Sequence, residues 1–370
     1  MSVMNNTPKG NANRVAVIVT EYRFNSHADV ILGRLLGDFD YSPTIEVVSI
    51  YTDQVPHNDM SRAEAKRCGV PIYSTIEETI ELPFAEGGLD GVIIIAEHGD
   101  YPRDEKGRIH YPRRQMLEEV LKSLDKLQIR VPVFSDKHFS YNIEDTLWIY
   151  QQVKKRNLPF MAGSSIPHTP YVPPIADEQL ITAEEWLVAS YSNLVEAYGY
   201  HALEVLQSVA ERRAGGETGI KSIQTLEGAE VWEAMEQGVW PEDMLLSCLA
   251  LNSSKKIIHP SESNEPTYLI VIEYLDGTKG YVFQQENLES YWSFSLRNQQ
   301  GIFAAKCESD DDRPFKHFET LTQMIEQFII TGKEQFPIER VFMSSGMINY
   351  AIESLYQHKK LETLELQIDY

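Results

Sequence analysis

The stretch "VPVFSDKHFSYN", residues 131–142, places three titratable side chains directly after a short apolar run. The run 131–134 predicts a buried β-strand, and Asp136, Lys137 and His138 follow where that strand should end. In open parallel sheets, ligands bind outside the carboxyl ends of the strands. Two explanations are open at this point: the three residues cap a strand end in solvent, or they act on a ligand.

Alternating strand and helix signals run through the first half of the chain. The apolar runs VAVIV (15–19) and GVIIIA (91–96) are typical of strands buried on both faces of a parallel sheet. Further strands are predicted at 45–51, 71–73 and 159–162, and helices at 29–36, 61–68, 116–127 and 144–156. This alternation predicts an α/β fold, a doubly wound parallel sheet with right-handed crossovers.

The pattern changes after residue 163. The segment 164–174 holds four prolines, which favours a linker or hinge. Beyond it, a helix is predicted at 200–212, strands at 219–225, 267–274 and 279–283, and helices at 318–331 and 344–357. Asp276-Gly277 lies between two of these strands and is a hairpin signal. The second half is therefore predicted to be α+β with an antiparallel sheet.

Charge and composition limit the partners. The 370 residues include 55 acidic and 33 basic ones, a formal net charge of −22, which disfavours binding to nucleic acid or to an anionic membrane. Cys68, Cys248 and Cys307 lie far apart, which suits a reducing compartment and supplies no cysteine-based zinc site. No secretory signal or run of 18 apolar residues is present, so we expect a cytoplasmic protein.

Four stretches resemble one known family of enzymes. They are GVPIYSTIEETI (69–80), LDGVIIIA (89–96), VFSDKH (133–138) with a helix and then LPFMAG (158–163), and FETLTQMIEQFIITGKEQFP (318–337). Together they resemble the glucose–fructose oxidoreductase/inositol dehydrogenase family, also called Gfo/Idh/MocA.

The resemblance implies a fold, an activity and an assembly. It implies a Rossmann-like nucleotide-binding domain at 14–165 and an α+β domain at 166–370 with an open antiparallel sheet; the polar residues 1–13 before them are expected to be a disordered tail. The implied activity is oxidation or reduction of a sugar, cyclitol or related polyol with NAD or NADP. The implied partners are a small sugar-like substrate and further copies of the chain, in a homodimer or homotetramer.

The resemblance also assigns the candidate catalytic residues. Lys137 matches the family lysine that lies near the nicotinamide and the substrate hydroxyl, and His201 matches the histidine that often serves as acid and base. Asp136 stands in place of the family glutamate, and His138 in place of the proline. The family usually has an aspartate four residues before the histidine, where this chain has Ala197, so one carrier of the usual proton relay is missing.

The loop after the first strand departs from the family. A dinucleotide-binding strand should run into glycines that let the backbone approach the pyrophosphate, but "TEYRFNSHAD" (20–29) contains none. Glu21 adds an unfavourable charge, which Arg23 offsets, and Asp53 follows the second strand where an acidic residue would hold a ribose. The candidate cofactor-binding residues are Thr20, Arg23, Asp53 and Glu97.

An insertion follows the strand at 91–96. The segment "EHGDYPRDEKGRIHYPRR" (97–114) leaves the sheet at the predicted active-site edge, where binding residues concentrate. With His138, it supplies the candidate substrate-binding residues His98, Asp100, Tyr101 and Arg113.

Other functions stay open. His98, Asp100, Asp136, His138, His201 and Glu204 together resemble a set of metal ligands, although they match no known spacing and could instead hydrogen-bond one another. A non-redox lyase, isomerase or hydrolase for a sugar-like substrate, with or without a divalent metal, is the alternative to an oxidoreductase. A catalytically inactive sensor or binding protein is a third class.

Overall fold

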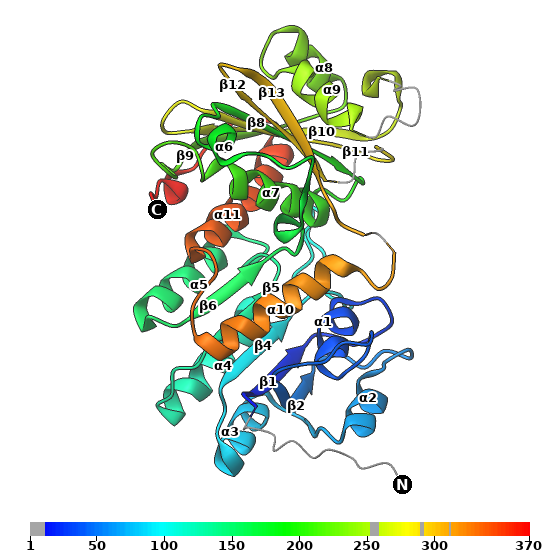
Figure 1. The fold of residues 1–370 in the computed structure, drawn as a ribbon, viewed down its shortest axis with the longest axis vertical. Helices are drawn as coiled ribbons and strands as arrows, with labels where there is room; N and C mark the ends of the chain where they lie inside the picture. The colour runs from blue at the N-terminus through cyan, green and yellow to red at the C-terminus, as the bar shows by residue number, and fades with distance from the viewer. Residues whose placement is uncertain (1–11, 252–258, 289–291, 311) are drawn as a thin grey trace.

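A six-stranded sheet forms the core of the first half of the chain. The structure is a computed structural model that describes residues 12–251, 259–288, 292–310 and 312–370. The strand order is β3-β2-β1-β4-β5-β6, and every neighbouring pair is parallel, which confirms the predicted doubly wound sheet (Figure 1). The strands are β1 (Arg14–Val19), β2 (Glu46–Thr52), β3 (Ile72–Tyr73), β4 (Gly91–Ile95), β5 (Val133–Asp136) and β6 (Phe160–Gly163).

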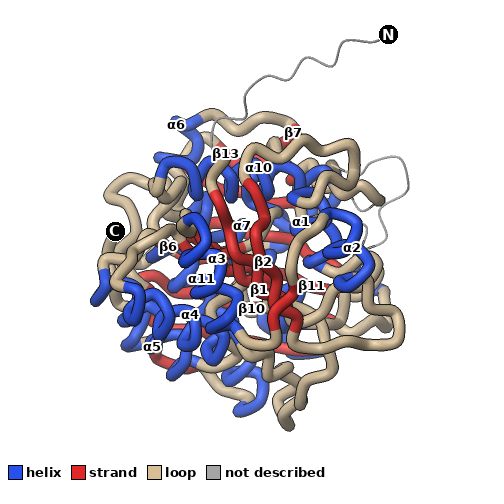
Figure 2. Tube along the Cα trace, turned by 90° about the horizontal axis from the view of Figure 1, so that it is seen from below, coloured by secondary structure: helices blue, strands red, loops and turns tan. Residues whose placement is uncertain are grey.

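Helices cover both faces of this sheet. Seen from below in Figure 2, α1 and α2 lie on one side of β1 and β2, and α3, α4 and α5 lie on the other. Their bounds are α1 (His27–Leu35), α2 (Ser61–Cys68), α3 (Ile76–Gly87), α4 (Arg113–Leu127) and α5 (Ile143–Arg156). Side-chain caps start three of them, because Ser26, Thr75 and Asn142 each accept a hydrogen bond from a backbone N–H in the first turn.

The second sheet is mixed and mostly antiparallel. Its order is β14-β9-β10-β11-β8-β12-β13-β7, and β8 with β11 is a parallel pair. The strands are β7 (Tyr171–Val172), β8 (Glu185–Tyr191), β9 (Ile220–Glu227), β10 (Thr267–Tyr274), β11 (Lys279–Gln285), β12 (Ser293–Asn298), β13 (Gly301–Cys307) and β14 (Leu361–Glu362). The predicted open antiparallel sheet is thus confirmed, except that β8 and β11 are parallel. The 164–174 segment is more than a linker, since β7 pairs with β13.

Helices fill the space between the sheets and cover the outer face of the second. α7 (Tyr200–Ala210) and α11 (Ile338–Gln357) contact each other, and α11 also contacts α5 and β9, so it joins the two halves (Figure 1). α8 (Ala229–Glu236) and α9 (Glu242–Ala250) lie on the far side of the second sheet, and a short helix α6 (Asp177–Ile181) lies at its edge. None of the helices in the described part of the chain is both long and apolar enough to cross a membrane.

The chain returns to the first sheet near its end. α10 (Lys316–Thr331) lies beside α1, and Ile329 packs where Gly91 starts β4, so closely that a Cβ on Gly91 would lie 2.4 Å from the Ile329 Cδ1 atom. A segment of the second half therefore completes the core of the first. The domain boundary at residue 165 stays a prediction, and most of the predicted 1–13 tail lies outside the described residues.

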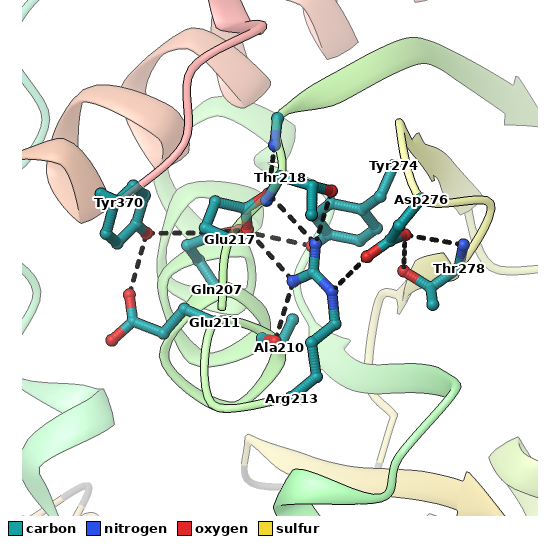
Figure 3. A network of polar contacts seen from close by, with 11 residues as sticks. Gln207, Ala210, Glu211, Arg213, Glu217, Thr218, Tyr274, Asp276, Thr278 and Tyr370 are labelled. Atoms are coloured by element: carbon teal, nitrogen blue, oxygen red, sulfur yellow. Dashed lines mark hydrogen bonds and ion pairs between the residues drawn. The ribbon is translucent and has the colours of Figure 1, made fainter. Parts of the chain in front are cut away.

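A buried polar network ties the end of α7 to the β10–β11 turn and to the last residue (Figure 3). The Arg213 guanidinium donates to Asp276 Oδ2 at 2.7 Å and to Glu217 Oε1 at 3.2 Å. The Gln207 amide donates to Glu217 Oε2 at 2.6 Å and to the Tyr370 hydroxyl at 2.8 Å. Because each charge is paired, this network rigidifies the scaffold without offering a free group for chemistry.

The placement of α10 predicts unequal effects for two neighbouring isoleucines. Ile329 is 2% exposed and Ile330 is 46% exposed. Ile329→Ala should lower the free energy of unfolding by about 2–4 kcal/mol, because it removes buried methyl groups and leaves a cavity. Ile330→Ala should change it by less than about 0.5 kcal/mol. Urea unfolding measures both values, and equal effects would contradict the packing of α10 on the first sheet.

Candidate functional site

The end of β5 buries the three titratable residues predicted from the sequence. Asp136, Lys137 and His138 are 1%, 5% and 4% exposed, so they do not cap the strand in solvent. Lys137 has φ 71, a left-handed conformation that non-glycine residues rarely adopt, and its N–H donates to Gly163 O at 3.2 Å. Strain of this kind clusters at functional sites, because the surrounding structure must hold it in place.

Lys137 and His201 make the central contact of the site. The Lys137 Nζ atom lies 2.5 Å from His201 Nε2, and the Ser164 Oγ atom lies 2.6 Å from His201 Nδ1. His201 is the second residue of α7, so this contact joins the end of β5 to the second half of the chain. At this distance one nitrogen donates a hydrogen bond to the other, so the amine and the imidazole are a hydrogen-bonded pair.

Burial sets the protonation of this pair. Desolvation lowers the pKa of Lys137, although Glu97 and Asp136 act in the opposite direction. Desolvation also holds the pKa of His201 well below its usual value, and the charge of Lys137 adds to this effect. A neutral amine or a neutral imidazole near physiological pH is a competent proton acceptor.

Asp136 pairs with a histidine that the sequence did not single out. The His27 Nδ1 atom lies 2.6 Å from Asp136 Oδ2, and His27 is the first residue of α1. Burial raises the pKa of Asp136 to about 6, and Lys137 and Arg113 oppose that shift. The sequence did offer one sign of this contact: His27 lies in the segment 20–29, where a dinucleotide-binding loop would have glycines.

Arg113 and Glu97 form a buried ion pair beside the site. An Arg113 Nη2–H donates to Glu97 Oε2, and Nη1 lies 3.3 Å from His138 Nε2. Burial alone would raise the pKa of Glu97, but Lys137 and Arg113 hold it below its usual range. The structure thus brings Arg113 into contact with His138, the residue that follows Lys137.

Two predicted substrate-binding residues contact the end of β2. Asp100 is exposed, and its backbone N–H and carbonyl oxygen bond the Gln54 amide at 2.8 and 3.0 Å. The Tyr101 hydroxyl donates to Asp53 Oδ2 at 2.6 Å. The insertion folds back over β2 here, so the structure does not bring these two residues into contact with Lys137. His98 lies closer to the site, because its ring is 5.2 Å from the ring of His27, which pairs with Asp136 next to Lys137.

Glu196 lies where the sequence lacks the expected aspartate. It belongs to a π-helical turn (Val195–Gly199), a form that often occurs at functional sites. Its Oε1 atom is 3.9 Å from His138 Nε2, and burial raises its pKa to about 7. A carboxyl group one position before Ala197 was visible in the sequence, and the structure places it in this π-helical turn, where its other oxygen, Oε2, accepts from Ile109 N at 3.0 Å.

The predicted cofactor-binding residues are engaged within the chain. The Thr20 hydroxyl donates to Glu97 O at 2.8 Å, and Arg23 contacts Glu21 and His98. The Asp53 carboxylate accepts hydrogen bonds from two tyrosine hydroxyls, at 2.8 and 2.6 Å.

The site fits the two ends of a nicotinamide dinucleotide unequally. Lys137 and Asp53 lie at the strand ends where the resemblance places the nicotinamide and a ribose. At the start of α1, however, Ser26 already caps Asp29 N, and Asp29, 1% exposed, pairs with Arg313 at 2.6 Å. A pyrophosphate at this helix end would meet the carboxylates of Asp29 and Glu21 and no glycine. The reactive end fits, whereas the pyrophosphate needs contacts other than a glycine-rich loop.

The metal alternative receives no support. Within residues 12–251, 259–288, 292–310 and 312–370, no three His, Cys, Asp or Glu side chains converge as a metal site requires. Glu204 instead accepts from Ser164 N at 3.1 Å and from the Ser344 hydroxyl, so it supports the segment that holds His201.

Comparisons with known proteins give the fold. No family model matches the chain, and no curated protein matches it. A scyllo-inositol dehydrogenase from Lactobacillus casei, solved with NAD(H) and scyllo-inositol, has a TM-score of 0.60 and 11% identity over 95% of this chain and 99% of its own. A myo-inositol dehydrogenase from Corynebacterium glutamicum ATCC 13032 has a TM-score of 0.58 and 12% identity over 95% and 98%. GenD2 from gentamicin A biosynthesis, solved with NAD, has a TM-score of 0.61 and 11% identity over 98% and 99%. The chain therefore has the two-part fold of these dehydrogenases along nearly its whole length.

The environment of Glu204 predicts a pH-dependent stability. Burial raises the pKa of Glu204 to about 7, whereas the unfolded group titrates near about 4.3. Its contribution to stability is thus present at low pH and lost as the pH rises through about 7. Glu204→Gln cannot titrate, so its melting temperature relative to the wild type should increase from pH 5 to pH 8.

Circular dichroism melts at four pH values test this expectation. The exposed Glu118→Gln serves as the control and should follow the wild type throughout. Parallel profiles for Glu204→Gln and the wild type would show that Glu204 titrates normally in the folded protein.

Proposed function

We propose that this protein is an NAD(P)-dependent oxidoreductase that acts on a hydroxyl group of a sugar, cyclitol or related polyol. The observation that carries the proposal is the buried contact between Lys137 Nζ and His201 Nε2 at 2.5 Å. The fold of inositol dehydrogenases supports it, and so does the position of Lys137 at the carboxyl end of a central strand.

The chain's own residues handle the proton of the reacting hydroxyl. In its neutral form, Lys137 would accept that proton at Nζ and pass it on through the contact with His201 Nε2. Ser164 holds the other ring nitrogen of His201 and thereby fixes the plane of the imidazole. A bound nicotinamide would supply the acceptor or donor of the hydride. Thr20 and Asp53 would hold a ribose of the dinucleotide, and Asp53 would first have to give up a hydrogen bond from Tyr51 or Tyr101.

The pair of Asp136 and His27 supports Lys137 from the opposite side. Burial lowers the pKa of Lys137 and the charge of Asp136 raises it, so the carboxyl group limits how far the pKa of the amine falls. With its own pKa raised to about 6, Asp136 loses its negative charge in mildly acidic solution. Protonation of Asp136 therefore removes one of the two charges, with Glu97, that raise the pKa of Lys137, and this favours the neutral amine.

A non-redox enzyme on the same scaffold is the second candidate. The closed N-terminal end of α1 favours it, because Asp29 and Glu21 oppose the pyrophosphate of a dinucleotide. In a lyase or isomerase, Lys137 and His201 would remove a proton beside a carbonyl group of a sugar-like substrate.

We extend the proposal to assembly and location. A homodimer or homotetramer that associates through the second sheet and works in the cytoplasm fits the proposed activity. Light scattering on the purified protein measures the number of chains, and a monomer at all concentrations would remove this part of the proposal.

Replacement of Lys137 tests the catalytic assignment. Lys137→Met keeps the apolar stem and removes the amine, so we expect the turnover rate to fall by at least about two orders of magnitude. The melting temperature should stay unchanged or rise, because a buried amine costs desolvation energy. The exposed Lys122→Met is the matched control and should retain full activity. An active or unfolded Lys137→Met protein would remove Lys137 from the mechanism.

Cofactor binding separates the two candidate functions. We expect NAD(H) or NADP(H) to bind weakly, with a dissociation constant above the micromolar range, because the α1 end supplies carboxylates to the pyrophosphate. Titration by nicotinamide fluorescence, with and without myo-inositol and scyllo-inositol, measures this constant. Failure of both cofactors to bind under all conditions would overturn the oxidoreductase and leave the non-redox enzyme.

A further inference from the structure

His98 is held in an unusual backbone conformation at the end of β4. It has φ 71, and the next residue, Gly99, has φ +116. Gly99 is required there, because a Cβ would lie 2.5 Å from the Tyr101 ring. The insertion that follows β4 therefore fixes the direction of the His98 side chain at the cost of backbone strain.

Arg23 determines which nitrogen of His98 carries the hydrogen. The Arg23 Nη2 atom lies 3.3 Å from His98 Nδ1, and a guanidinium can only donate. His98 Nδ1 must then accept, so the ring hydrogen is on Nε2. Arg23 is itself held by Glu21, whose Oε1 atom lies 2.5 Å from Arg23 Nε. Glu21, Arg23 and His98 form a continuous chain of charge-assisted contacts.

The Nε2–H group of His98 is a buried donor with no hydrogen-bond partner among the described residues. An orphaned buried donor is unfavourable and calls for an explanation such as a bound ligand. The ring stays neutral, because burial, Arg23 and Lys137 lower its pKa and Glu97 and Asp136 only partly oppose them. It lies 5.2 Å from the His27 ring, which pairs with Asp136 beside Lys137.

We propose that His98 is a neutral hydrogen-bond donor to the reacting oxygen of the substrate, in its carbonyl or oxyanion form, and that Arg23 is the positioning residue for it. The substrate class is then a polyol that is oxidised to a ketone, or a keto sugar. His98 transfers no proton; its Nε2–H stabilises negative charge on the oxygen while Lys137 and His201 handle the proton. This proposal adds a residue to the proposed function, and it rests on that function for the assumption that the substrate reacts at Lys137 and His201.

The proposal gives the glycine-free loop a role. Residues 20–26 would not receive a pyrophosphate but would support a donor on the neighbouring strand end. Arg23 is engaged on two sides, with Glu21 and His98, and a phosphate would have to break both contacts to use it. The two possible roles of Arg23, to bind a cofactor phosphate or to orient His98, therefore predict different results for one variant.

Nuclear magnetic resonance of protein labelled with ¹⁵N in its histidine rings tests the arrangement without a substrate. In the wild type, His98 should be neutral at pH 7, with hydrogen on Nε2 and an accepting Nδ1. Arg23→Met should raise the pKa of His98 and remove the hydrogen bond to Nδ1. The control Arg62→Met, which removes an exposed arginine on α2, should change neither. The proposal would be overturned if wild-type His98 carried its hydrogen on Nδ1, or if Arg23→Met changed neither the pKa of His98 nor the hydrogen bond to Nδ1.

Kinetics with NAD and myo-inositol or scyllo-inositol then tests the role in the reaction. Loss of one oxyanion donor costs about 10²–10³ in kcat, which we expect for His98→Leu. His98→Gln keeps an N–H donor and should recover at least about tenfold of that loss. Arg23→Met should lower kcat with little change in the KM for NAD; a raised KM for NAD with unchanged kcat would assign Arg23 to the cofactor. Without turnover by the wild type, the proposed function fails and the resonance experiment alone decides the role of Arg23.

Discussion

The desolvation of Lys137 is the constraint on which the site depends. An amine with 5% exposure, at a left-handed backbone position, is stable only if neighbouring groups hold it. Asp136 and Glu97 supply negative charge, and His201 supplies a nitrogen at 2.5 Å from the other half of the chain. His201 lies on α7, and α11 packs on α7, on α5 and on β9. The contact between Lys137 and His201 therefore depends on the same helices that hold the two sheets together.

The β1–α1 loop is the part of the first sheet that fits a dinucleotide least. The chain has the fold of solved inositol dehydrogenases along nearly its whole length, at 10 to 12% identity. The β1–α1 loop lacks the glycines typical of a dinucleotide-binding loop, and Glu21, Arg23 and Asp29 form ion pairs within the chain. Fold alone does not assign function, so the activity is argued from the residues at the strand ends.

The sequence predicted much of the fold because buried parallel strands have a distinct apolar signature. The runs at 15–19 and 91–96 became β1 and β4, and Asp136, Lys137, His138 and His201 came together as expected. Asp100 and Tyr101 did not, because the direction of an insertion depends on tertiary contacts with Gln54 and Asp53. β8 was missed, since its EWLVASY pattern mixes both strand and helix signals, and the His27–Asp136 contact spans 109 residues.

Direct titration of Lys137 tests the central claim, that burial makes its amine a proton acceptor paired with His201. Carbon-13 labelling of lysine Cε gives one resonance per lysine, and Lys137→Met identifies the one that belongs to Lys137. We predict that Lys137 titrates below the ordinary lysine value of about 10.4 and apart from the exposed Lys122. Titration of Lys137 together with the exposed lysines would contradict it.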